Sequence, residues 1–235
     1  MSRAPCSSVT PLSWNCSLTE LNRVKSGRTG WPRSRTTGLE GADSWSTDGH
    51  KWLQLPYDSG FAIVRDAQAH RRAMSITASY LPPIGAEEYD PGQYVPELSR
   101  RARGFAVWAQ LRALGRRGVA EMVGGHCVLA RRLASRLAAE PGVHVLNSVH
   151  LNQVLVNFGG GTHEERDAFT RATIARMQAD NACFTGGADW HGRWVLRLSV
   201  ISASLTDTDI DRLATAVLSS WRTVQHEVCR PSTFA

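Results

Sequence analysis

Proline and glycine interrupt this chain of 235 residues in its first half. Between residues 75 and 96 there are four prolines and two glycines: Pro82, Pro83, Pro91, Pro96, Gly85 and Gly92. Proline cannot continue a helix or occupy a central strand, so this stretch excludes a regular element and predicts a long loop. Long loops inside compact proteins are usually functional or disordered.

The spacing of apolar residues predicts the secondary structure of the segments on either side of the loop. Two amphipathic helices are expected after it, at 97–114 with a stop at Gly115 and at 119–139 before Pro141. Before the loop, the apolar run at 60–64 predicts a buried strand, with Lys51 on the turn that precedes it.

Beyond residue 140 the pattern changes to short strands and capped helices. Three apolar runs predict strands: 143–146, 154–158 and 194–201. Two capping boxes predict helix starts: Thr162-x-x-Glu165 and Thr206-x-x-Asp209. The order strand, strand, helix, strand, helix predicts a small α+β unit with a short, mainly antiparallel sheet backed by helices.

Lys51 is unusual because it is one of only two lysines, beside 25 arginines, and no lysine follows it. Arginine is effectively never deprotonated, whereas a desolvated lysine can lose its proton and attack a carbonyl carbon to form a Schiff base. A lysine retained in an arginine-rich chain therefore predicts chemistry that arginine cannot perform. The alternative is a surface lysine retained by chance.

One stretch of sequence contains this lysine, and three further stretches that follow it along the chain matter as well. They are Ser44-Trp45-Ser46-Thr47-Asp48-Gly49-His50-Lys51-Trp52, Pro56-Tyr57-Asp58-Ser59-Gly60, Pro96-Glu97-Leu98-Ser99-Arg100-Arg101-Ala102-Arg103-Gly104 and Trp194-Val195-Leu196-Arg197-Leu198-Ser199. Together they resemble the group II pyridoxal-phosphate-dependent amino-acid decarboxylases, which include aromatic-amino-acid, glutamate and diaminobutyrate decarboxylases. The resemblance runs from about Gly38 to about Arg222.

The resemblance implies an α/β fold: the C-terminal part of a fold-type I pyridoxal-phosphate enzyme, with the end of the large-domain sheet and a small α+β domain. It implies pyridoxal 5′-phosphate as cofactor, an amino acid as substrate and a homodimer for the full-length form. Lys51 would bind the cofactor through its amine and later protonate the substrate carbon after carbon dioxide leaves. The cofactor serves as electron sink, while the protein sets orientation and protonation.

The resemblance also gives roles to other residues. Arg197, expected as a buried-side residue of a strand, would hold the substrate carboxylate bidentately, with a structural ion pair as the alternative. His50 and Ser44 would contact the cofactor phosphate, or else form hydrogen bonds within a turn. Asp48 stands where some relatives carry Asn, and Trp52 is expected to pack in the interior.

The proline-rich loop corresponds to a mobile loop of the family. In that loop a tyrosine, often contributed across a dimer interface, donates the proton that completes decarboxylation. Tyr94 and Tyr89 are the candidates here, and surface packing is the alternative for both. The following cluster, Arg100, Arg101 and Arg103, could bind phosphate, but a solvated helix start is the commoner explanation.

The first 38 residues differ from the rest of the chain. They hold six basic residues and one acidic residue, Glu20, whereas residues 39–235 hold 21 basic and 20 acidic residues. Because the excess charge lies in this segment, the basic balance does not predict a nucleic-acid or membrane partner. In the family a larger region precedes the lysine and supplies a stacking aromatic residue and an Asp paired with the ring nitrogen. We expect residues 1–38 to be a degraded start joined to a genuine C-terminal half.

These features divide the chain into four expected parts. Residues 1–38 form an atypical basic segment that is not a domain, and 39–75 form the end of the cofactor-binding large domain with the lysine turn. Residues 76–118 form the mobile loop and a connecting helix, and 119–235 form the small α+β domain.

Cysteine and histidine usage excludes several kinds of site. Five widely spaced cysteines without a Cys-x-x-Cys pair argue for a reducing compartment. The histidines form no His-x-x-x-His pair, so the sequence does not predict a metal site. No apolar run approaches the roughly 18–20 residues that span a bilayer. A cytoplasmic protein is therefore expected.

Two classes of function remain open from the sequence. The first is a pyridoxal-phosphate-dependent decarboxylase that converts an amino acid to an amine. The second is a non-catalytic remnant, which is favoured for the isolated chain because no carboxylate was found to pair with the ring nitrogen. A missing half supplied by a separate chain, or an aminotransferase-like or other lyase activity of the same fold, are further alternatives.

Overall fold

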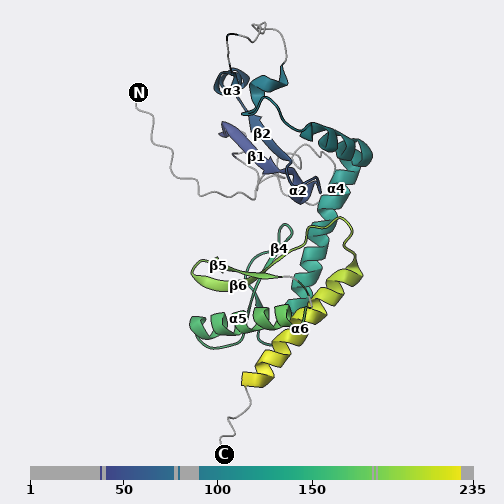
Figure 1. The fold of residues 1–235 in the computed structure, drawn as a ribbon. Helices are drawn as coiled ribbons and strands as arrows, with labels where there is room; N and C mark the ends of the chain where they lie inside the picture. The colour runs from purple at the N-terminus through teal and green to yellow at the C-terminus, as the bar shows by residue number, and fades with distance from the viewer. Residues whose placement is uncertain are drawn as a thin grey trace, which may run out of the picture. The chain divides into compact units, whose positions relative to one another are not determined.

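The computed structural model describes residues 38, 41–76, 79, 90–181, 183 and 185–228 (Figure 1). They belong to two compact units, Met1–Ala120 and Glu121–Ala235. The expectations for residues 1–37 and for Tyr89 lie outside the described residues.

The first unit contains an antiparallel pair of strands, β1 (Ser44–Asp48) and β2 (Gly60–Val64), joined through the short helix α2 (Gly49–Trp52). The strand predicted at 60–64 is confirmed, but the prediction that it is buried was wrong. All its residues are exposed or half-buried, and Ile63 is 47% exposed. In the described part of the chain β2 pairs only with β1, and the ribbon is two-stranded.

The proline-rich stretch follows helix α3 (Ala67–Met74), and its described residues include the short 3₁₀ helix η3 (Pro91–Tyr94). Asp90 precedes η3, and its carboxylate accepts a hydrogen bond from the Gly92 N–H at 2.8 Å. Pro91 at the first position needs no donor there. The prediction that this stretch contains no regular element was therefore wrong at these four residues, which form a single helical turn.

Helix α4 (Arg103–Ala138) belongs to both units. Within it Gly115 has φ 61° and ψ −177°, so two helical segments meet there in a kink, as the stop predicted at Gly115 indicates. The helix begins at Arg103 and not at Glu97. The Arg103 N–H donates to the Arg101 carbonyl at 2.8 Å, and this tight turn keeps the preceding residues out of the helix.

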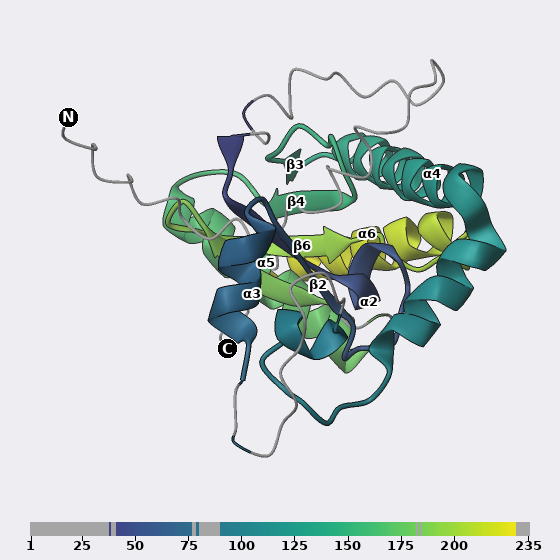
Figure 2. The ribbon, with the colours of Figure 1, turned by 90° about the horizontal axis from the view of Figure 1, so that it is seen from above.

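The second unit has an antiparallel sheet backed by helices, as predicted, and the sheet has four strands where three were expected. Its strand order is β3 (Val143–Val145), β4 (Gln153–Phe158), β6 (Arg193–Ser199) and β5 (Gly186–Trp190). Figure 2 shows β3, β4 and β6 side by side. Strand β5 was not predicted, because Gly186 and Gly187 remove the side chains that would show its alternation.

Helices α5 (His163–Ala179) and α6 (Asp207–Val228) cover one face of this sheet. The core takes alternate residues from the strands, among them Val154, Val156 and Phe158 from β4. These side chains pack against residues from α5, α6 and the C-terminal half of α4, including Met177, Trp221 and Leu133. Because a strand turns alternate side chains to one face, all three helical segments lie on the same side of the sheet.

Both predicted capping boxes are confirmed at the starts of these helices. The Thr162 hydroxyl accepts the Glu165 N–H at 3.3 Å, and the Glu165 carboxylate accepts the Thr162 N–H at 2.7 Å. Likewise, the Thr206 hydroxyl accepts the Asp209 N–H at 3.3 Å, and the Asp209 carboxylate accepts the Thr206 N–H at 2.9 Å. Each pair satisfies backbone donors that a helix start leaves without partners.

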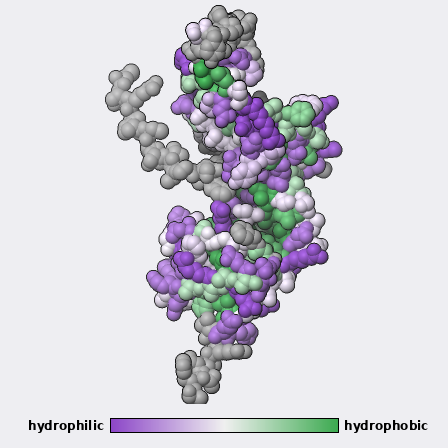
Figure 3. Space-filling model, viewed as in Figure 1, coloured by the Kyte–Doolittle hydropathy of each residue, from purple (hydrophilic) through white to green (hydrophobic). Residues whose placement is uncertain are grey.

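Exposed large apolar side chains on α4 are Phe105, Trp108, Leu111 and Val128. Hydrophobic residues gather over part of α4 on the face shown in Figure 3. No described helix has the combination of length and apolar character that crossing a membrane requires.

Candidate functional site

Lys51 lies in the four-residue helix α2, directly after strand β1. Its side chain is 35% exposed, so the amine is partly sheltered but accessible. The rigid β1–β2 pair holds both ends of the segment, because Asp48 pairs with Gly60 at the last position of the register. The structure thus presents this lysine from a short turn anchored at both ends.

Asp48 is the immediate partner of the lysine. Lys51 Nζ donates a hydrogen bond to Asp48 Oδ2, and the two groups form an ion pair. Asp48 is the N-cap residue of α2, yet its side chain caps no backbone N–H. The hydrogen bond from Lys51 lowers the pKa of the Asp48 carboxyl, against a smaller opposing effect of burial. The carboxylate therefore stays charged beside the amine.

His50 stacks on the ring of Tyr57, with ring centroids 4.2 Å apart and planes inclined by 23°. The His50 Nδ1 atom is buried and has no hydrogen-bond partner among the described residues. A buried polar atom without a partner is costly unless something binds it. His50 therefore carries an unused hydrogen-bonding position next to Lys51.

Close packing beneath α2 fixes this turn. A Cβ atom on Gly49 would lie 2.7 Å from the end of the Leu55 side chain and 3.0 Å from the Phe61 ring, so a larger residue there would require these side chains to shift. The Gly49 N–H donates to the Ser59 carbonyl at 2.7 Å, and the Leu55 N–H donates to the Gly49 carbonyl at 3.2 Å. Trp52 is buried, as predicted.

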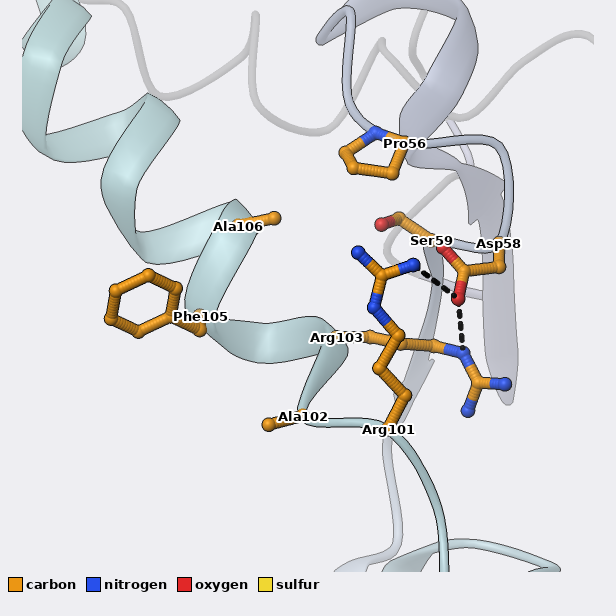
Figure 4. Close-up of a pocket in the computed structure, with 8 residues that line it drawn as sticks. All are labelled: Pro56, Asp58, Ser59, Arg101, Ala102, Arg103, Phe105 and Ala106. Carbon is orange, nitrogen blue, oxygen red and sulfur yellow. Dashed lines mark hydrogen bonds and ion pairs between the residues drawn. The ribbon is translucent and has the colours of Figure 1, made fainter.

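Asp58 links the lysine segment to the start of α4. Its Oδ2 atom accepts a hydrogen bond from Arg103 Nε at 3.1 Å and lies 3.5 Å from a terminal nitrogen of Arg101 (Figure 4). In the same unit, the Gln110 amide donates to the Leu53 carbonyl at 3.1 Å. Two arginines of the predicted cluster thus pair with a carboxylate 43 and 45 residues earlier in the chain.

The remaining predicted residues lie elsewhere. Ser44 is exposed at the far end of β1, four residues and roughly 13 Å from Asp48. Tyr94 ends η3, and its half-buried ring meets the His70 ring edge-on at 5.4 Å. Among the predicted site residues that the structure describes, only His50 is brought directly beside Lys51.

Arg197 lies on β6 of the second unit, opposite Leu155 of β4 and Gly186 of β5. The expectation of a buried side was wrong. Leu196 and Leu198 turn to the core, and Arg197 is exposed on the other face. Gly186, its neighbour on β5, has open space where a Cβ would stand.

Asp58, Tyr57 and Gln54 also shape the site, although no individual role was expected for them. Gln54 donates its side-chain amide to the Lys51 carbonyl at 2.6 Å, which holds the end of α2. Asp58 and Tyr57 belong to the stretch Pro56–Gly60 that carried the resemblance, so their position in a motif was the available signal. Their partners could not be inferred from it.

A family model described as the pyridoxal-dependent decarboxylase conserved domain matches residues 30–158. This match covers more than half of the chain and includes the Lys51 turn, the proline-rich stretch and α4. It starts somewhat before the resemblance noted at Gly38.

Individual proteins give the same result. The chain is 26% identical over 179 residues to 3,4-dihydroxyphenylacetaldehyde synthase of Aedes aegypti, covering 74% of this chain and 33% of that protein. It is 24% identical over 193 residues to tyrosine decarboxylase 2 of Arabidopsis thaliana, covering 80% and 34%. The chain thus spans about a third of the length of these relatives.

A solved structure has the same fold. The Oryza sativa TDC with PLP and tryptamine superposes with a TM-score of 0.70 at 22% identity, covering 83% of this chain and 40% of that one. The predicted fold class, an α/β part of a fold-type I pyridoxal-phosphate enzyme, is confirmed.

Proposed function

Because the chain belongs to the pyridoxal-dependent decarboxylase family, we propose that it carries the cofactor lysine of an enzyme that removes carbon dioxide from an amino acid. The observation that supports this most directly is Lys51, an accessible amine on a fixed turn inside the family match. The named relatives act on tyrosine or form an aromatic aldehyde, so an aromatic amino acid is the proposed substrate class.

The residues of the lysine turn fit pyridoxal 5′-phosphate. Lys51 would hold it through its amine, and the unpartnered buried Nδ1 of His50 would contact it next to that bond. Ser44 is proposed as a phosphate contact only through a rearrangement of β1, because it lies at the other end of the strand. When bound, the group supplies the electron sink that stabilises a carbanion at the substrate Cα.

The chain's own residues would control the proton and the substrate. The Lys51 amine must leave Asp48 before it can react, and Asp48 is then placed to take up the ammonium again when the amine is released. Arg197, exposed and flanked by Gly186, has a planar guanidinium suited to a bidentate bond with the substrate carboxylate. Tyr94 remains the described candidate for the proton donor.

Amine production tests this function. The purified chain, supplied with pyridoxal 5′-phosphate, would be incubated with tyrosine, tryptophan, histidine and glutamate, and amine and carbon dioxide would be measured. Release that disappears in Lys51→Arg would support the proposal, since arginine keeps the charge but cannot form the bond. Release that persists in Lys51→Arg would contradict it.

A second candidate function, a non-catalytic member of the family, is favoured by the ion pair between Lys51 and Asp48. In that case Lys51 stabilises the turn and never reacts. Absence of product from all four amino acids, together with loss of stability in Lys51→Met, would support this alternative.

A further inference from the structure

A small hollow in the first unit has no role in the proposed function, and we propose that it binds a small organic carboxylate with an apolar body. Its volume is about 260 Å³, somewhat below that of pockets for drug-sized ligands. It is lined by Pro56, Asp58, Ser59, Arg101, Ala102, Arg103, Phe105 and Ala106 (Figure 4).

Ser59 provides a hydrogen-bonding group that the protein itself does not use. The residue is only 4% exposed, and its Oγ atom has no hydrogen-bond partner among the described residues. Its backbone is fixed, because the Ser59 N–H donates to the Pro56 carbonyl and its carbonyl accepts the Gly49 N–H. Figure 4 shows the hydroxyl directed away from Asp58 and into the space between Pro56 and Ala106. Because the Oγ atom itself has almost no accessible surface, a ligand oxygen would satisfy it only after a small shift of the neighbouring side chains.

Arg101 provides the positive charge. Figure 4 shows its guanidinium between the Ser59 hydroxyl and Asp58, with one terminal nitrogen toward Asp58 and the other toward the hollow. The contact with Asp58 is long, at 3.5 Å, and the side chain is 66% exposed. An arginine fork that uses one edge for Asp58 keeps donors for a second carboxylate.

Asp58 would repel an anion if its charge were not balanced, and Arg103 balances it. Arg103 Nε lies closer to Asp58, at 3.1 Å, than Arg101 does. Arg103 also lies 3.6 Å from Glu97, which does not line the hollow. The charged groups of the lining are one carboxylate and two guanidiniums, so their sum is +1.

The rest of the lining is apolar and decides what kind of anion fits. Pro56, Ala102, Phe105 and Ala106 surround the Arg101–Ser59 corner, and Phe105 is 72% exposed at the rim. The hollow also adjoins the start of α4, where a helix favours negative charge. An inorganic anion would bury none of these apolar side chains, whereas the ring of an aromatic carboxylate would cover them and gain the free energy of burying apolar surface.

The test uses ligand-observed fluorine NMR with 4-fluorobenzoate as the probe and the full chain without pyridoxal phosphate. Because the contacts are partly exposed, the expected dissociation constant is on the order of 1–10 mM. The uncharged 4-fluorobenzamide, of the same shape, should bind at least about fivefold more weakly. Since Lys51 plays no part, failure here is distinguishable from failure of the proposed decarboxylase function.

Matched variants locate the site. Arg101→Ala should weaken 4-fluorobenzoate binding at least about fivefold and Ser59→Ala about threefold. Arg100→Ala removes the same charge from a residue outside the lining and should change binding less than about twofold. Urea unfolding of each variant verifies that the fold is kept. Equal binding of the benzamide, equal weakening by Arg100→Ala, or no saturation below about 50 mM would each overturn the proposal.

Discussion

Lys51 Nζ donates a hydrogen bond to Asp48 Oδ2 across the first turn of α2, so the one amine proposed to react is held by the carboxylate three residues before it. An exposed ion pair of this kind contributes about 0.2–1 kcal/mol. The contact is therefore strong enough to slow a reaction of the amine but too weak to prevent it.

Asp48→Asn should expose this effect. Without the carboxylate, reductive labelling of Lys51 by pyridoxal 5′-phosphate should become about two- to fivefold faster, because no ion pair has to break first. The rate is measured by quenching with borohydride at intervals and quantifying the Lys51 peptide. Asp43→Asn removes an exposed carboxylate that pairs instead with Arg65, and it should leave the rate unchanged. Slower labelling of Asp48→Asn would show that Asp48 assists the amine.

Asp211 should make the second unit sensitive to acid. Hydrogen bonds from Arg132, assisted by Arg136, lower the pKa of Asp211 from 3.8 to about 2. A lowered folded pKa means that the stabilisation is complete above pH 3.8 and is lost as the pH falls toward 2. Urea unfolding between pH 2 and 7 should give a shallower pH dependence below pH 4 for Asp211→Asn than for the parent chain.

Asp207→Asn is the comparison for that experiment. Asp207 also approaches Arg132, at 3.4 Å, but its side chain is 66% exposed. Its replacement should change the pH dependence of stability below pH 4 much less than Asp211→Asn does. If the parent chain and Asp211→Asn lost stability identically below pH 4, Asp211 would not be the cause of the acid sensitivity.

Thr162→Ala should destabilise the second unit by about 1 kcal/mol, because the start of α5 loses its side-chain acceptor. Thr162→Ser keeps the hydroxyl and should cost much less. Thermal or urea unfolding followed by far-ultraviolet circular dichroism measures both. A loss in Thr162→Ser equal to that in Thr162→Ala would rule out the capping bond as the cause.

Leu133 on α4 is fully buried in the core of the second unit. Leu133→Ala should lower the free energy of unfolding by about 2–5 kcal/mol through lost burial and the resulting cavity. Val128→Ala, on the same helix but 55% exposed, should stay within about 0.5 kcal/mol of the parent chain. A similar small effect for both would mean that this core is not formed in solution.

The features that the sequence predicted well depend on neighbouring residues. The capping boxes at Thr162 and Thr206 and the break at Gly115 each follow from a few positions in a row, so they are readable without the fold. The lysine turn was predicted from a resemblance that rests on four stretches between Ser44 and Ser199. For the capping boxes and the break, the physical cause lies within one turn of the chain.

The features that it missed depend on distant residues or on hidden periodicity. The contact of Asp58 with Arg103 joins residues 45 positions apart, and no local pattern encodes it. The buried side expected for Arg197 came from the resemblance, and the strand pattern could not correct it, because Val195 and Leu196 are adjacent and both buried. The exposure of β2 depends on what packs against its two faces, and its own apolar residues do not reveal that.

The most direct test of the central claim is where pyridoxal 5′-phosphate binds. The purified chain would be titrated with the cofactor, reduced with borohydride and mapped by peptide mass spectrometry. Lys25, Lys51 and the N-terminal amine are the amines available in this sequence. We expect saturable labelling that is confined to Lys51 and abolished in Lys51→Arg. Weak, unsaturated labelling shared among all three amines would contradict it.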